Sequence, residues 1–395
     1  MTEHSSSVLT PLGLPDPAIL WESERPALQA LQHEARRRLK SPWALLSAAI
    51  TQSLLSIPYP VRYRSSLVPE GTPLNLAIAL VGRSGAGKST VFRGAAAAIV
   101  FDGTSLPDAD TSRSGEGIPA LLAHIQAERG TEPRLCWRRP DRALWVHWDE
   151  VGQLGAQSAR TGSTVLESIK SLTSGEQLGG QNSKGDGLTI PPATYRALVT
   201  IAVQPRRAAP LLSEEAIAGG LAARFLWFNF EDADAATLPR PTHSTDPVTV
   251  SRNQWDGVGH VDALPEMDAA HEADARAALA GIREPIDSRV QLNRAIIAIA
   301  LANLDGRSTL VPEDWLLAGA VIAHSLDTLE HVRDALSQPD DAEHAQETAI
   351  ANRMVARMEK LRCDGIPFDQ ARRRLSRPQG DALTALLNEG RYSRW

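Results

Sequence analysis

Residues 74–94 read LNLAIALVGRSGAGKSTVFRG, and this stretch predicts a strand, a glycine-rich turn and a helix in direct succession. Residues 76–81 are an apolar run of strand length, and the eight residues that follow fit G-x-x-x-x-G-K-[ST] at every fixed position. Glycines let the backbone curl so that its N–H groups point at phosphate oxygens, and the N-terminus of the next helix attracts the same anion. The pattern is typical of a nucleotide-binding P-loop. The alternative is a glycine-rich turn that binds nothing.

Two side chains of this loop have predicted roles in the chemistry. Lys88 is expected to reach the β- and γ-phosphates, and Ser89 to offer its hydroxyl to Mg²⁺, which prefers oxygen ligands. The expected cofactors are therefore ATP and Mg²⁺. The predicted cofactor-binding residues are Gly82, Ser84, Gly85, Ala86, Gly87, Lys88, Ser89 and Thr90.

A second apolar strand, residues 143–148, ends in Asp149 and Glu150, about sixty residues after the P-loop. Acidic residues at strand ends are common, so this pair of carboxylates indicates a catalytic site only because a predicted P-loop precedes it. Asp149 is expected to hold the water shell of Mg²⁺ beside Ser89, and Glu150 to polarise the water that attacks the γ-phosphate. His147, between two tryptophans, is expected to pack in the strand rather than to act in catalysis.

The stretch from residue 162 to residue 230 predicts a helix, a hairpin and two more strands. The helix covers 162–175, and the hairpin has a polar, glycine-rich tip that carries Lys184. A buried strand at 196–203 ends at Gln204, which is either a sensor of the γ-phosphate or an ordinary polar residue at the sheet edge. Arg224 precedes the last apolar strand, at 225–230.

Composition and charge narrow the class of protein. The chain has 395 residues, 43% hydrophobic and 22% charged, which is ordinary for a globular protein of several domains. Its two cysteines are far apart, and no apolar run approaches the roughly 18 residues that span a bilayer. We therefore expect a cytoplasmic protein without a disulfide framework, a zinc site or a membrane partner.

Charge is sorted along the chain around a formal net charge of −6. Residues 229–287 carry 12 acidic and 4 basic side chains, whereas residues 351–395 carry 10 basic and 5 acidic ones. A solvated surface explains any one basic cluster as well as a binding role does.

The segments outside these motifs predict further elements. Helical spacing covers residues 26–57 with a break at Ser41–Pro42, and a strand is expected at 61–67, followed by a turn at 69–73. Another helix is expected at 118–128. An acidic linker, 231–265, leads to helices at 269–282, 289–304 and from 312.

In the order of its motifs, the chain resembles the AAA+ ring ATPases of the helicase type, in particular minichromosome-maintenance and viral helicases and the primase-associated helicases of phages and mobile elements. The stretches that carry the resemblance are GRSGAGKST, WVHWDEVGQL, SGEQLGG with GLTI, TIAVQP and GGLAARFLWF, all within residues 74–230. The chain departs from the family in having no primase domain and in having Gln204 where asparagine is more usual.

The resemblance implies a homo-oligomeric ring, a hexamer in this family, with single-stranded DNA in its pore. Lys184 would touch the DNA there, and Arg224 would act on the nucleotide of the neighbouring subunit. In a helical lid, Arg289 or Arg294 would reach the nucleotide, unless these arginines form surface salt bridges. A separate primase is an expected partner.

The C-terminal segment contains two helix-like pieces, 369–375 and 380–389. It is similar to a winged-helix module in which Arg372, Arg373, Arg374 and Arg377 would face phosphates. A small partner-binding or packing bundle is the alternative.

The expected fold is therefore α/β, a P-loop NTPase core of the AAA+ type with flanking helical parts. The predicted domains are an N-terminal helical region (1–60), the ATPase core (61–235), an acidic linker with a helical lid (236–338) and the C-terminal module (339–395). The expected function is an ATP-dependent DNA helicase or translocase that acts in phage or mobile-element replication. The alternatives are an ATPase that loads or remodels a protein, or a nucleotide-gated binding module.

Overall fold

The computed structural model describes residues 13–83, 88–112, 114–126, 134–160, 163–180, 187–233, 237–337 and 354–373, together with Leu375, Leu383 and Tyr392. The chain divides into two compact units, Met1–Ala335 and Leu336–Trp395. Each unit has its own cluster of buried apolar side chains.

The first unit is built around an all-parallel sheet of five strands in the order β12-β3-β11-β8-β5. These strands are β12 (Phe225–Asn229), β3 (Leu76–Val81), β11 (Arg196–Val203), β8 (Ala143–Trp148) and β5 (Ala109–Asp110). Every residue of β3 and β11 is buried, as expected of central strands covered on both faces. The mixed α/β class predicted from the sequence is confirmed, and β3, β8, β11 and β12 lie where apolar runs predicted strands.

Helices cover both faces of this sheet. The connection from β3 to β5 runs through α4 (Lys88–Ala98), whereas the connections that return across the sheet contain α6 (Val151–Ser158), α7 (Val165–Ser174), α8 (Ala209–Leu212) and α9 (Glu214–Ala218). Right-handed crossovers in opposite directions place these two groups of helices on opposite faces.

The helix α3 (Pro42–Ser56) is the centre of one face. All 15 of its residues are buried, and it packs on α4, on α12 (Val290–Leu304) and on the strands β3, β8, β11 and β12. A helix that is apolar all round needs cover on every side, and α3 receives it. The N-terminal helices α1 (Ile19–Glu22) and α2 (Pro26–Arg38) belong to the same core, and the break predicted at Ser41–Pro42 is confirmed.

The helices after the sheet also join this core. They are α11 (Pro265–Leu279), α12 and α13 (Pro312–Ser337). An ion pair connects the start of α2 with α13. Arg25 Nη1 donates to Asp314 Oδ1 at 2.7 Å, and the Asp314 side chain is fully buried. The helices predicted to form a lid and the predicted N-terminal region therefore share one buried core with the sheet.

Three local expectations are wrong. The helix predicted at 118–128 stops early: α5 (Gly117–Leu122) is followed by the antiparallel hairpin of β6 (Ala123–Gln126) and β7 (Arg134–Trp137). The turn predicted at 69–73 is part of β2 (Val68–Pro73), which pairs with β1 (Arg62–Ser65). The stretch 231–265 is more than a linker, because β13 (Val248–Ser251) pairs with β4 (Ile99–Asp102) and β14 (His260–Asp262) pairs with β1. The first two errors concern hairpins between neighbouring segments, whereas the third depends on strand partners that are distant in sequence and that local preferences do not encode.

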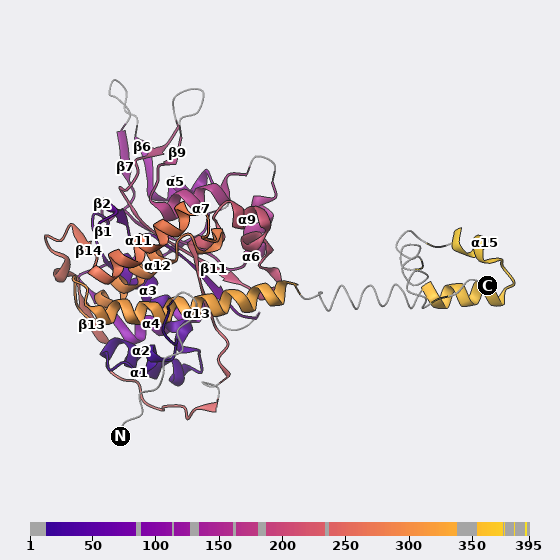
Figure 1. The fold of residues 1–395 in the computed structure, drawn as a ribbon, viewed down its shortest axis with the longest axis horizontal. Helices are drawn as coiled ribbons and strands as arrows, with labels where there is room; N and C mark the ends of the chain where they lie inside the picture. The colour runs from indigo at the N-terminus through magenta and orange to yellow at the C-terminus, as the bar shows by residue number, and fades with distance from the viewer. Residues whose placement is uncertain are drawn as a thin grey trace. The chain divides into compact units, whose positions relative to one another are not determined.

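The predicted hairpin after α7 is confirmed in its arms, β9 (Leu178–Gly179) and β10 (Thr189–Ile190), which pair antiparallel. Its tip, with Lys184, lies outside the described residues. The arms of β6 and β7 and the strand β9 lie at the same end of the first unit (Figure 1).

The second unit has a small core of Met354, Met358, Phe368, Ala371 and Leu383. Its described helices span residues 354–363 and α15 (Phe368–Arg373). Arg372 and Arg373 are exposed in the last turn of α15, whereas Arg374, Arg377 and the predicted helix 380–389 lie outside the described residues, apart from Leu383. In the described part of the chain, none of the helices combines the length and the apolarity that crossing a membrane requires.

Candidate active site

The candidate site lies at the carboxyl ends of β3, β11 and β8. From β3 the chain runs on to β5 at one edge of the sheet, whereas from β11 it runs to β12 at the other edge. The connections that leave β3 and β11 therefore run in opposite directions across the sheet, which makes this the point where the direction of the connections switches. Ligands of open α/β sheets bind at such a switch point.

The candidate P-loop, residues 82–90, begins at the carboxyl end of β3. Gly82, directly after β3, donates its N–H to the carbonyl oxygen of Val203 at 3.0 Å, one residue before Gln204. Ser84, Gly85, Ala86 and Gly87 lie outside the described residues, and Lys88 and Ser89 are described by their backbone alone, as the first residues of α4. Thr90 follows in the first turn of this helix. The described backbone therefore has the predicted strand before residues 84–87 and the predicted helix after them.

Glu150 and Gln204 come together at the ends of neighbouring strands. Gln204 Nε2 donates to Glu150 Oε1 at 2.9 Å, and Arg207 Nη1 donates to the same oxygen at 3.0 Å. Glu150 is the N-cap residue of α6, and its side chain is 38% exposed. The carboxylate is thus held from one side and remains open to water, which suits a group that must polarise a water molecule.

Asp149 is oriented by a chain of hydrogen bonds that starts inside the sheet. Trp145 Nε1 donates to Thr200 Oγ1 at 2.8 Å, the Thr200 hydroxyl contacts His147 Nδ1 at 2.7 Å, and His147 Nε2 lies 3.3 Å from Asp149 Oδ1. Burial lowers the pKa of His147 below its usual value, although Asp149 raises it in part, so the imidazole is neutral at pH 7. With Thr200 donating to Nδ1, the His147 Nε2–H is free to donate to the carboxylate.

The donor set at this edge fits Mg²⁺. The Asp149 side chain is 75% exposed and presents hard carboxylate oxygen at the end of a central strand. A cation that keeps most of its water needs few direct protein ligands, and an exposed carboxylate is a ligand of the kind that it prefers.

Arg224 lies at the amino ends of the strands, opposite the carboxyl ends where the candidate site lies. It precedes Phe225, which pairs with Ala77, so it lies at the level of Leu76, whereas the P-loop starts after Val81. At about 3.3 Å per residue, this separation is roughly 20 Å along the strands. Arg224 is therefore too far away to reach the P-loop of its own chain.

Arg289 accompanies Arg224 at this edge. Arg224 Nη2 and Arg289 Nη1 both donate to Ser174 Oγ, at 3.3 and 3.1 Å. Burial and then the charge of Arg224 lower the pKa of Arg289 to about 10, and burial also lowers the pKa of Arg224. The other lid candidate, Arg294, is 8% exposed, stacks on the ring of Trp315 and donates to the Trp315 carbonyl oxygen at 2.9 Å. Arg294 thus holds α12 against α13.

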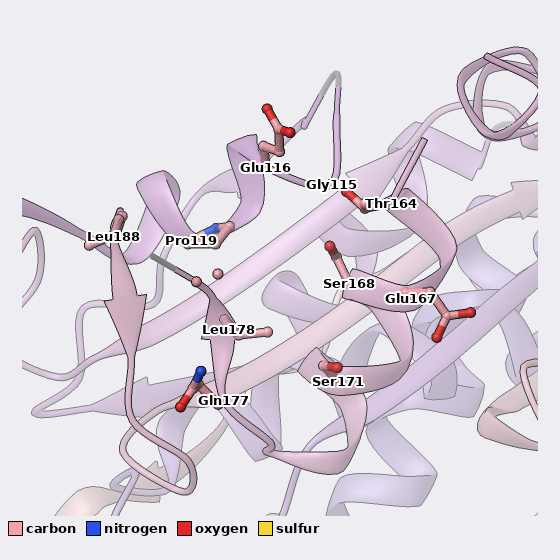
Figure 2. Close-up of a pocket in the computed structure, with 12 residues that line it drawn as sticks. Gly115, Glu116, Pro119, Thr164, Glu167, Ser168, Ser171, Gln177, Leu178 and Leu188 are labelled. Atoms are coloured by element: carbon pink, nitrogen blue, oxygen red, sulfur yellow. The ribbon is translucent and has the colours of Figure 1, made fainter. Parts of the chain in front are cut away.

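A cavity of about 580 Å³ lies between α5, α7 and the β9–β10 hairpin (Figure 2). Its lining includes Glu116 and Pro119 from α5, Ser168 and Ser171 from α7, and Leu178 from the hairpin. Gly179 has φ +72°, and a Cβ there would lie 2.1 Å from the carbonyl oxygen of Leu188, so the hairpin arms pack too closely for any other residue. The two arms of the hairpin therefore pack closely at its base. The residues that line the cavity do not include residues 82–90.

The sequence missed Arg207 and the role of His147. Arg207 belongs to a basic pair after Gln204, which a solvated loop explained equally well. A charged residue three positions after a candidate sensor was the available signal, but its partner Glu150 is 57 residues away in the chain. His147 does pack in the strand as expected, but its second nitrogen faces Asp149.

No family model matches the chain, and a search of curated proteins finds no match.

Proposed function

We propose that this chain is a Mg²⁺-dependent ATPase that drives movement on DNA as part of a homo-oligomeric ring. One observation carries the ATPase proposal: the start of the P-loop, Gln204 and Glu150 meet at the carboxyl edge of a parallel sheet, at its switch point. The three motifs are far apart in the sequence. Their convergence supports one common site.

In this proposal the P-loop residues 82–90 bind the phosphates, with Lys88 on the β- and γ-phosphates. Ser89 and Asp149 hold Mg²⁺, and the bound metal supplies charge neutralisation of the triphosphate. His147 orients the Asp149 carboxylate towards the metal. Glu150 accepts a hydrogen bond from the attacking water, and the Gln204 amide fixes the rotamer of Glu150.

The position of Arg224 supports a ring. An arginine that lies roughly 20 Å from its own P-loop can act on a nucleotide only across a subunit interface. The Nε of Arg224 is buried without a hydrogen-bond partner, so one of the N–H donors of this guanidinium is unused. DNA as the substrate follows from the resemblance and from the hairpin whose tip carries Lys184. The phage or mobile-element setting and the separate primase follow from the resemblance alone.

The test is the rate of phosphate release by the full chain with ATP and Mg²⁺, with and without single-stranded DNA. We expect hydrolysis that needs Mg²⁺ and is stimulated by DNA. Hydrolysis without stimulation would favour the protein-remodelling alternative. ATP binding with negligible hydrolysis would favour the nucleotide-gated module.

Two variants separate binding from hydrolysis. Lys88→Ala should abolish ATP binding, because it removes the cation on the phosphates. Glu150→Gln should bind ATP normally and lose at least about 100-fold in turnover, because the amide is a poor proton acceptor. Glu215→Gln, an exposed substitution of the same kind on α9, is the matched control. Unchanged turnover in Glu150→Gln would remove Glu150 from catalysis.

A further inference from the structure

A second cavity, of about 390 Å³, lies at the carboxyl end of β12, the strand beside the P-loop strand β3. We call it the aromatic cavity. It combines segments far apart in the chain, since its lining residues come from α1, α2, the start of α3, the segment after β12 and α13. Its volume is in the range of small-molecule sites, roughly 300 to 1,000 Å³.

One residue, Glu231, connects the aromatic cavity with the start of the candidate P-loop. Phe230 donates its N–H to the carbonyl oxygen of Val81 at 2.8 Å, and the next residue, Glu231, lines the cavity. Glu231 Oε1 accepts a hydrogen bond from the backbone N–H of Arg83 at 3.2 Å. One side chain therefore contacts both the cavity and the second residue of the P-loop.

One wall of the cavity is aromatic and rigid. Trp43 stacks on His324 with ring centroids 3.9 Å apart and ring planes at 4°, and Trp21 meets Trp43 edge to face at 5.1 Å. Burial lowers the pKa of His324 to about 3, so this wall carries no charge at neutral pH. Pro17, Pro42 and Leu238 add further apolar surface. Such a wall suits a flat, uncharged ring system.

The polar part of the lining suits the edge of such a ring. Gln32 offers an amide donor and acceptor, Arg36 a guanidinium, and Glu231 and Asp232 carboxylates. Heterocyclic bases and ribose carry donors and acceptors on their edges that can pair with side chains of this kind.

We propose that the aromatic cavity holds the base and ribose of the nucleotide whose phosphates the P-loop binds. This inference rests on the proposed function, and it assigns the part of the ligand that the P-loop motif leaves open. Trp21, Trp43 and His324 are then residues that determine affinity for a nucleoside triphosphate over a bare triphosphate.

The test compares two probes, ATP and inorganic tripolyphosphate, each titrated calorimetrically into the full chain with Mg²⁺. We expect ATP to bind at least about tenfold more tightly than tripolyphosphate, since stacking of one base contributes a factor of that size or more. Ala18→Trp fills the cavity from its rim with a residue that is exposed and lies outside the core. It should weaken ATP binding about ten- to hundredfold and leave tripolyphosphate binding within twofold.

Two further variants make the result decisive. Leu238→Asp, at a leucine that is 42% exposed, places a charge at the cavity without touching the core and should also weaken ATP binding alone. Ala280→Trp, at an exposed position that does not line the cavity, is the matched control. Equal binding of ATP and tripolyphosphate by the wild type, or normal ATP binding by both cavity variants, overturns the inference. A wild type that binds neither probe overturns the proposed function with it.

Discussion

His147 illustrates how one side chain can serve packing and chemistry together. Its ring lies in the aromatic layer beside Trp145 and Phe92, and its Nε2 lies 3.3 Å from the exposed carboxylate of Asp149. A carboxylate at a strand end has free rotamers unless a partner holds it. His147 is thus a positioning residue for the proposed metal ligand.

His147→Leu should therefore raise the Mg²⁺ concentration for half-maximal ATPase activity about ten- to hundredfold, because outer partners of metal ligands contribute effects of this size. His147→Gln, which keeps a donor, should recover part of the loss. The measurement is a Mg²⁺ titration of the ATPase rate, with the exposed His124→Gln as control. An unchanged Mg²⁺ dependence in His147→Leu would leave the histidine with a packing role only.

The lowered pKa of His324 should make the free energy of unfolding depend on pH. The pKa of its imidazole is lowered from 6.5 to about 3 by burial, so the folded state keeps it neutral in a range where the unfolded state protonates it. Because the unfolded state then binds more protons, the free energy of unfolding falls as the pH falls from 6.5 towards 3, by at most about 1.4 kcal/mol per pH unit. Above pH 6.5 this histidine has no effect on the slope.

His324→Phe keeps an aromatic ring against Trp43 and removes the titration. Urea unfolding at pH 7 and at pH 5 should show a smaller loss of stability in acid for this variant than for the wild type. Parallel losses in the two proteins would mean that other groups dominate the acid sensitivity.

At the scale of elements, the β9–β10 hairpin is the part that the DNA proposal needs. Its arms pair antiparallel, and they approach each other closely at Gly179, where a Cβ would lie 2.1 Å from the carbonyl oxygen of Leu188. The β6–β7 hairpin, which the sequence did not predict, lies at the same end of the unit and exposes Arg134 (Figure 1). Two hairpins at one end offer a larger surface to a polymer than the sequence indicated.

We expect Lys184→Ala to keep basal ATPase activity and to lose DNA stimulation, because a lysine that neutralises phosphate contributes to DNA binding and to its dependence on salt. The measurement is the ATPase rate against DNA concentration at two salt concentrations. Lys40→Ala, between α2 and α3 and far in sequence from the hairpin, is a lysine control. Full stimulation in Lys184→Ala would favour the protein-remodelling alternative.

At the scale of the whole molecule, the two edges of the sheet have different roles in the proposal. The carboxyl edge carries the P-loop, Glu150 and Asp149, whereas the amino edge carries Arg224 with Arg289. In the proposal, Arg224 and the P-loop can act on the same nucleotide only if they belong to different copies of the chain. The amino ends of the strands in one copy must then face the carboxyl ends of the strands in the next.

Mixing Arg224→Ala subunits with Lys88→Ala subunits should therefore restore part of the ATPase activity that each variant lacks alone. A mixed interface pairs an intact P-loop with an intact arginine, and its fraction depends on the mixing ratio. The measurement is the rate across a series of ratios. Hydrolysis at the wild-type rate by protein shown to be monomeric would contradict action between subunits.

The sequence by itself determined the elements whose signals are local. An apolar run before G-x-x-x-x-G-K-[ST] predicts a buried strand, which the structure has as β3, and β8, β11, β12 and α7 follow from runs and end signals of the same kind. It also predicted Glu150 and Gln204 as members of one site, and the structure brings them within 2.9 Å.

Only the tertiary structure decided what depends on distant partners. The insertion of β11 between β3 and β8, the pairing of β13 with β4 and the pairing of β14 with β1 need strand partners that are distant in sequence. The pairing of Arg207 with Glu150 and the joining of Trp21, Trp43 and His324 in one cavity are equally invisible in the sequence. The physical reason is that local preferences act within a few residues, whereas burial and side-chain pairing are set by which segments the folded core brings together.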